Sequence, residues 1–138
     1  MKRDMDLVRE ILLKAETREK VSTGDLLGLV EPTEEGAKKL AYHLEMLTQQ
    51  AKFLGGNAHW THGVGPNHDE ARREWYALDL TWAGHEFLDA VRDPEIWRKT
   101  KEGANKVGNW ALDFVVELAK GYAKQKAKEM LGIDLGND

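Results

Sequence analysis

Apolar residues recur at helical spacing in the first part of the chain. They lie at Leu7, Val8, Ile11, Leu12 and Ala15. Residues spaced in this way share one face of a helix, and the charged residues between them face the other way. Asp4 precedes the run and is a favourable N-cap residue. The pattern predicts an amphipathic helix that begins after Asp4 and ends near residue 19.

Two further helices are predicted before residue 51. Ser22 or Thr23 is suited to cap a short helix, which Gly28 weakens. Pro32 ends that helix, and Thr33 can cap the next one. Residues 34–50 form the clearest helix of the chain, and its apolar stripe consists of Ala37, Leu40, Ala41, Leu44 and Leu47.

A hairpin follows this helix. Residues 51–54 lead into an extended run, and residues 74–80 are rich in aromatic side chains, as strands are. Between them lies a stretch with glycine, proline, asparagine and aspartate, a composition typical of loops. We expect two antiparallel strands joined by a long loop, which is a wing.

Helices fill the rest of the chain. Thr81 can cap a helix that ends near residue 92, and Asp93 followed by Pro94 and an acid is a strong start for another. A glycine and an asparagine at 108–109 interrupt it. The last helix is predicted over residues 110–131, with Gly132 as its stop.

This order of elements predicts a mainly α fold with a small β-hairpin, namely a winged helix-turn-helix core with a C-terminal helical extension. We place the winged-helix domain at residues 1–92 and the extension at residues 93–138. The alternative is another small α+β domain of the same length, because element order alone does not fix topology.

Two blocks of sequence support the winged helix by resemblance. Residues 40–47, Leu-Ala-Tyr-His-Leu-Glu-Met-Leu, and residues 53–56, Phe-Leu-Gly-Gly, resemble the recognition helix and first wing strand of winged helices of the multiple-antibiotic-resistance-regulator and arsenic-repressor type. Residues 80–88, Leu-Thr-Trp-Ala-Gly-His-Glu-Phe-Leu, are similar to the segment by which the second wing strand of those proteins enters the next helix.

A second resemblance covers nearly the whole chain. Residues 1–7, the Tyr-His-Leu step at 42–44, the block at 80–90, the Arg-Asp step at 92–93 and Trp97 resemble a family of uncharacterised phage and prophage proteins. The resemblance implies a bacteriophage or prophage setting but no activity. The chain departs from the family pattern in its long, His-rich wing loop and in the Gln-Gln-Ala-Lys turn at 49–52.

Composition narrows the class of protein. Of the 138 residues 41% are hydrophobic, enough for one core, and the absence of cysteine excludes disulfides and thiolate zinc sites. No apolar run reaches the roughly 18 residues of a membrane span. Asp4 and Asp6 interrupt the apolar stretch that a signal peptide would need, so we expect a protein of the bacterial host cell's cytoplasm.

Nine polar or basic residues are candidate contacts to double-stranded DNA. Their side chains suit phosphates and base edges, and they would lie on the 34–50 helix and the wing. They are Lys38, Lys39, Tyr42, His43, Gln49, Gln50, Lys52, Arg72 and Arg73. Charge opposes this interpretation, because residues 1–92 carry 12 Lys and Arg against 16 Asp and Glu and so hold the whole net charge of −4.

Other candidate chemistry is weaker. His59, His62 and His68 with Asp69 could bind a metal, but a polar loop without metal is the favoured interpretation. No nucleophile elbow, P-loop or dinucleotide fingerprint occurs, so we expect neither enzyme activity nor a cofactor.

The last helix has more apolar surface than one winged helix needs, and we expect a homodimer interface there. Its candidate residues are Trp110, Phe114, Leu118 and Tyr122. A helix on a membrane surface is less favoured, because acidic residues dilute its basic end. Two functions follow as hypotheses: a dimeric DNA-binding transcriptional regulator, or a phage module that binds and modulates a host protein, such as a defence protein.

Overall fold

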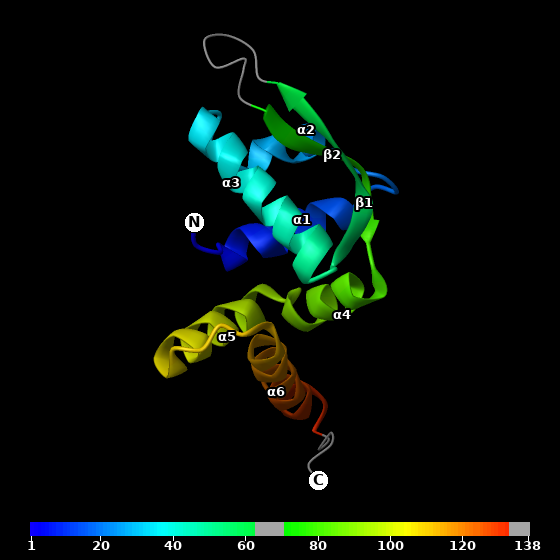
Figure 1. Cartoon of the computed structure of the whole chain (residues 1–138). Helices are drawn as coiled ribbons and strands as arrows, with labels where there is room; N and C mark the ends of the chain where they lie inside the picture. The colour runs from blue at the N-terminus through cyan, green and yellow to red at the C-terminus, as the bar shows by residue number, and fades with distance from the viewer. Residues whose placement is uncertain (63–70, 133–138) are drawn as a thin grey trace. The chain divides into compact units, whose positions relative to one another are not determined.

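The computed structural model describes residues 1–62 and 71–132. For residues 62, 71 and 72 it describes the backbone alone. Within the described residues the protein is mainly helical, with one two-stranded antiparallel hairpin (Figure 1). The chain divides into two compact units, Met1–His85 and Glu86–Asp138. The mainly α class with a small hairpin is therefore confirmed, whereas the division at residue 92 stays a prediction.

The helices of the first unit begin at the predicted caps. Helix α1 spans Met5–Glu16, and the Asp4 carboxylate accepts a hydrogen bond from the Leu7 amide. The short α2, Thr23–Leu26, has Ser22 as its N-cap, and a 3-10 turn, η1, follows over Leu27–Leu29. Helix α3 spans Glu34–Glu45 and is capped by Thr33. The predicted single helix to residue 50 instead changes to a π-helical turn, η2, over Met46–Gln50.

The hairpin is longer than predicted. Strand β1 spans Leu54–His62 and pairs with β2, Ala71–Leu80. A bulge interrupts the register at Gly56, where a Cβ would lie 2.9 Å from the Leu78 side chain. The segment from His59 to His62, expected in a loop, is strand, because it pairs residue by residue with β2.

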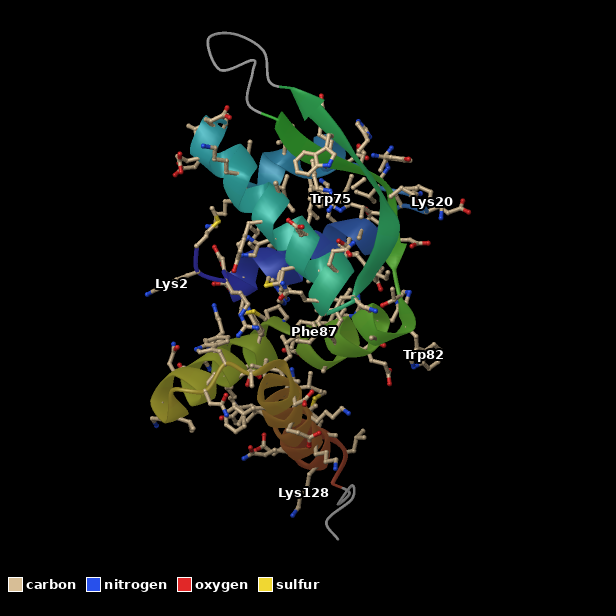
Figure 2. The ribbon with its side chains drawn as sticks, viewed as in Figure 1. Lys2, Lys20, Trp75, Trp82, Phe87 and Lys128 are labelled. Carbon is tan, nitrogen blue, oxygen red and sulfur yellow. The ribbon has the colours of Figure 1, made fainter. Side chains whose placement is uncertain are left out.

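The core of the first unit lies between its helices and the hairpin. Strand β2 packs on α1 and α3, and the Val21 and Leu78 backbones exchange two hydrogen bonds, which ties the segment before α2 to the hairpin. Figure 2 shows Trp75 on the hairpin, and its side chain is only 3% exposed. The other buried side chains of this unit include Leu12, Leu26, Leu40, Leu44 and Leu54.

The junction between β2 and the next helix, α4 (Trp82–Val91), is held by Thr81. Its hydroxyl donates to the Lys52 carbonyl and accepts from the Gly84 amide, at 2.6 and 3.1 Å. A Cβ at Gly84 would lie 2.1 Å from the Phe53 carbonyl oxygen. The Leu-Thr-Trp-Ala-Gly run is thus a packed strand-to-helix connection, in which glycine permits the close approach.

The second unit is built on two helices, α5 (Pro94–Val107) and α6 (Leu112–Leu131). Asp93 caps α5 as predicted, and Gly108 and Gly132 end α5 and α6 in the left-handed conformation. Val115 and Ala119 of α6 are buried. Within the described ranges, no helix combines the length and apolar character that crossing a membrane requires.

Candidate functional site

A buried histidine joins the start of α1 to the last turn of α3 in the first unit. His43 of α3 has no exposed surface, and its Nε2 accepts a hydrogen bond from the Asp4 amide at 2.8 Å. Its Nδ1 lies 2.7 Å from the Lys39 carbonyl, so this nitrogen carries the proton and the ring is neutral. The predicted DNA-contact role does not fit this placement, because both ring nitrogens are used inside the protein.

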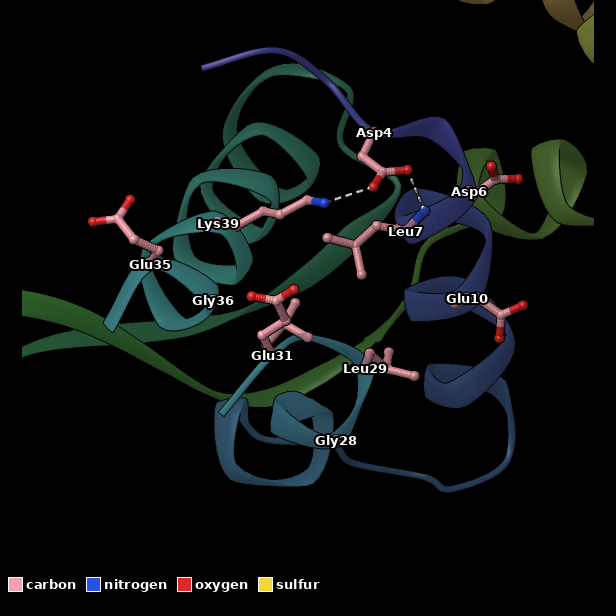
Figure 3. Close-up of a pocket in the computed structure, with 11 residues that line it drawn as sticks. Asp4, Asp6, Leu7, Glu10, Gly28, Leu29, Glu31, Glu35, Gly36 and Lys39 are labelled. Atoms are coloured by element: carbon pink, nitrogen blue, oxygen red, sulfur yellow. Dashed lines mark hydrogen bonds and ion pairs between the residues drawn. The ribbon is translucent and has the colours of Figure 1, made fainter. Parts of the chain in front are cut away.

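Lys39 is also engaged at this point. Its ammonium group lies 2.7 Å from the Asp4 carboxylate, which also caps α1 (Figure 3). The hydrogen bond from Lys39 is the main cause that lowers the pKa of Asp4. Burial is the main cause that lowers the pKa of His43, and it outweighs the bond to the Lys39 carbonyl and the charge of Asp4, which act the other way.

The exposed face of α3 carries mixed charge. Glu35, Lys38, Tyr42 and Glu45 are exposed and follow one another at steps of three or four residues. They form one stripe along the helix, which Gln49 of η2 extends. We call these five residues the α3 stripe, and it carries two carboxylates and one ammonium group.

Arg73 of β2 lies beside the α3 stripe rather than free in solution. Its guanidinium is 3.5 Å from the Glu45 carboxylate and lies over the rings of Trp60 and Trp75, at 5.8 and 5.5 Å from their centroids. Trp75 is buried, whereas Trp60 is 68% exposed. A guanidinium held by two rings and a carboxylate is less available to a phosphate.

The remaining predicted contacts are spread along the unit. Gln50 and Lys52 are exposed at the far end of η2, and Lys52 has a left-handed backbone with φ of 57°. Arg72 pairs with Thr61 in the hairpin. Lys38, Tyr42 and Gln49 thus share one stripe, Arg73 borders it, and Lys39, His43, Gln50 and Lys52 lie elsewhere.

A groove that the sequence did not predict lies between α1, the residues after α2, and the start of α3. It has a volume of about 600 Å³ (Figure 3). Five carboxylates and one ammonium group line it, together with the apolar Leu7, Leu29 and Val30. The acidic members are Asp4, Asp6, Glu10, Glu31 and Glu35. We call this feature the acidic groove.

Close backbone packing forms one side of the acidic groove. A Cβ at Gly36 would lie 2.0 Å from the Glu31 carbonyl oxygen, so glycine allows the turn to lie against the first turn of α3. Gly28, across the turn, has open space around it. The acidic residues were visible in the sequence, but only tertiary packing brings α1 and the 28–31 turn together.

Of the three histidines expected in the hairpin, the structure describes the side chain of His59. His59 contacts Tyr76, with ring centroids 5.5 Å apart. The side chain of His62 and the residues His68 and Asp69 lie outside the part of the chain that the structure describes. No group of three or more metal-ligating side chains occurs where the structure describes the chain.

The predicted dimer residues make contacts within the second unit. The Trp110 indole donates to the Asn105 side chain at 3.0 Å and meets the Trp97 ring edge-on. A Cβ at Gly103 of α5 would lie 3.0 Å from the Tyr122 hydroxyl and 3.3 Å from Leu118. Phe114, Leu118 and Tyr122 also line a shallow hollow on α6, so part of their surface stays open.

Comparison with known proteins places this small helical protein in a family. Residues 2–109 match the family described as "Hypothetical protein (DUF2513)", and the chain belongs to that family. It is also 29% identical over 133 residues to an "Uncharacterized protein" of Haemophilus influenzae (strain ATCC 51907 / DSM 11121 / KW20 / Rd). The aligned region covers 95% of this chain and 99% of the relative. No solved structure matches the chain.

Proposed function

We propose that the first unit is a winged-helix module of phage or prophage origin that binds a host protein. The order of three helical segments and a hairpin supports the winged-helix assignment, as does the bridge that ties Val21 to Leu78. A fold of this kind does not decide between DNA and protein as partner. That choice rests on the charges of the surface.

The mixed charge of the α3 stripe carries the proposal. A DNA-binding helix gains affinity when its lysines and arginines neutralise phosphates and release counterions. Here Lys39 pairs with Asp4 and Arg73 with Glu45, and Glu35 and Glu45 flank Lys38 on the exposed stripe. Phosphate would have to displace two carboxylate partners, Asp4 and Glu45, and approach the further negative charge of Glu35. A protein surface of mixed charge meets neither obstacle.

The second candidate is a dimeric DNA-binding regulator. Lys38, Tyr42 and Gln49 favour it, because they share the α3 stripe and have side chains that contact phosphates and base edges. In that case α3 would enter the major groove, and the hairpin would touch the flanking backbone.

Titration with a random-sequence DNA duplex separates the two candidates. We expect the folded protein to show no binding at low salt, where the electrostatic contribution is largest. Binding at low salt that weakens steeply as salt rises, and that Lys38→Glu abolishes, would establish the DNA-binding candidate instead. In parallel, the tagged chain should retrieve one host protein in stoichiometric amount, and the two purified components should form a complex.

A further inference from the structure

We infer that the acidic groove receives a basic segment of the partner protein, in which a lysine or arginine stands next to an apolar residue. This inference rests on the proposed function, since it names the surface through which the module would bind. All residues of the groove belong to the first unit. Charge, lining and shape each contribute to the argument.

Charge selects a cationic occupant. The single ammonium group in the lining, that of Lys39, is already paired with Asp4. Glu10 pairs with Arg9, at 3.6 Å, whereas Glu31 and Glu35 make no ion pair among the described residues. Lys2 and Arg3 precede Asp4 without lining the groove. Anionic ligands such as nucleotides or phosphates would meet repulsion from these carboxylates.

The apolar lining adds a second requirement. Leu7 is 6% exposed and lies beside Leu29 and Val30, so the groove holds aliphatic surface between its carboxylates. A volume of about 600 Å³ lies within the usual range of ligand-binding clefts. Aliphatic surface bordered by carboxylates suits the methylene stem and charged end of lysine or arginine together with an apolar neighbour.

A metal ion fits the groove less well. No three of its acidic side chains are close enough to hold one ion jointly, since no such group occurs within the described ranges. The carboxylates come from α1, the turn after η1 and α3, and so line the groove along its length. Such a distribution matches a peptide better than a point charge.

Peptide titration tests the inference. The probe is a short peptide of alternating arginine and leucine, and its counterpart alternates glutamate and leucine. We expect the arginine peptide to shift the backbone NMR signals of Glu10, Glu31 and Glu35, and the glutamate peptide to leave them unchanged. The double variant Glu31→Gln/Glu35→Gln should bind about tenfold more weakly, since two exposed ion pairs are lost.

A matched control separates the groove from general acidity. Glu19→Gln/Glu74→Gln removes the same charge from the first unit outside the groove and should bind as the unaltered protein does. Gly28→Leu should also weaken binding, because its side chain enters open space at the groove, whereas Gly28→Ala should have a smaller effect. Circular dichroism checks that each variant is folded.

Two results would overturn the inference: equal weakening in both double variants, or signal changes centred away from the groove. The proposed function fails separately. If a purified host partner binds Glu31→Gln/Glu35→Gln and Gly28→Leu as tightly as the unaltered protein, the acidic groove is not the binding surface, but the proposed binding of a host protein stands. DNA binding that Lys38→Glu abolishes would refute the proposal that the first unit binds a host protein rather than DNA.

Discussion

The Nε2 atom of His43 accepts a hydrogen bond from the backbone amide of Asp4, which precedes it by 39 residues. The bond connects the N-cap of α1 with the last turn of α3. The Asp4 carboxylate meanwhile binds Lys39, one turn before His43 on the same helix. Asp4 therefore fixes α1 against α3 through both its backbone and its side chain, and the acidic groove borders this junction.

Stability should fall below pH 6.5 because of His43. Burial lowers its pKa below 6.5 in the folded protein, so in that window the unfolded chain binds more protons. The stabilising contribution of neutral His43 is complete above pH 6.5 and is lost as the pH falls through the lowered pKa of the folded protein. Protonation also removes the acceptor for the Asp4 amide. Urea unfolding at a series of pH values should show this decrease.

The variant His43→Gln isolates this effect from the other histidines. Glutamine does not titrate, so its free energy of unfolding should depend less on pH over the same window. At neutral pH the variant should be less stable by about 1–3 kcal/mol, the usual cost of a disturbed buried hydrogen bond. Equal pH dependence in both proteins would show that His43 is not the titrating group.

Asp4 should cause a second decrease in stability, at more acidic pH. The hydrogen bond from Lys39 lowers the pKa of Asp4 below 3.8, so its contribution is present above pH 3.8 and disappears as pH falls below it. Lys39→Met should remove most of this acid dependence, whereas Lys38→Met, the neighbouring substitution, should leave it unchanged. The readout is the midpoint of acid unfolding followed by circular dichroism.

Local chemistry explains which parts of the fold the sequence predicts well. Asp4, Thr33 and Asp93 each cap the helix that was expected, because capping depends on a few adjacent residues. Gly132 stops α6 for the same kind of reason. The part of β1 beyond residue 56 was missed, because residues 57–62 lead into a stretch of loop composition and only their pairing with β2 makes them strand.

The candidate site was less accessible to sequence reasoning. His43 sits on a polar-looking face of its helix, yet Asp4 lies against that face and buries it. Arg73 was expected to contact DNA from the wing, but Glu45 and two tryptophans surround its guanidinium. Both outcomes depend on partners far away in the sequence, which periodicity does not reveal.

Gly84→Ala should destabilise the first unit. The new methyl group would lie 2.1 Å from the Phe53 carbonyl oxygen, so the strand-to-helix connection must shift. Overpacking of this kind costs about 1–3 kcal/mol. Gly28→Ala is the matched control, because its methyl group meets open space. Urea unfolding of the two variants should differ by at least about 1 kcal/mol; equal stabilities would refute the close approach at Gly84.

Two glycines of the second unit should respond oppositely to alanine. Gly121 lies within α6 with nothing near its Cβ position, so Gly121→Ala should stabilise the helix by up to about 1 kcal/mol. Gly108 has a φ of 77°, where alanine is strained, so Gly108→Ala should cost about 1 kcal/mol. Thermal unfolding measures both, and a gain at Gly108 would contradict the left-handed end of α5.

Asp93 should contribute to the second unit in two separable ways. One carboxylate oxygen accepts from the Glu95 and Ile96 amides and caps α5, and the other lies 2.6 Å from the Lys126 ammonium of α6. The pKa of Asp93 is lowered, first by the bond from Lys126, and the pKa of Lys126 is raised by the same bond. The pair should therefore stabilise the unit between pH 3.8 and 10.5 and lose its effect beyond either limit.

Three substitutions distinguish the cap from the ion pair. Asp93→Ala removes both and should lower the melting temperature most. Asp93→Ser keeps a capping oxygen but has no charge to bind Lys126, so it should lower the melting temperature less than Asp93→Ala does. Lys126→Met leaves the cap intact and should lower the melting temperature about as much as Asp93→Ser does. Because exposed ion pairs contribute little, the cap should account for most of the difference. Equal losses for Asp93→Ala and Lys126→Met would instead assign the stabilisation to the contact between α5 and α6.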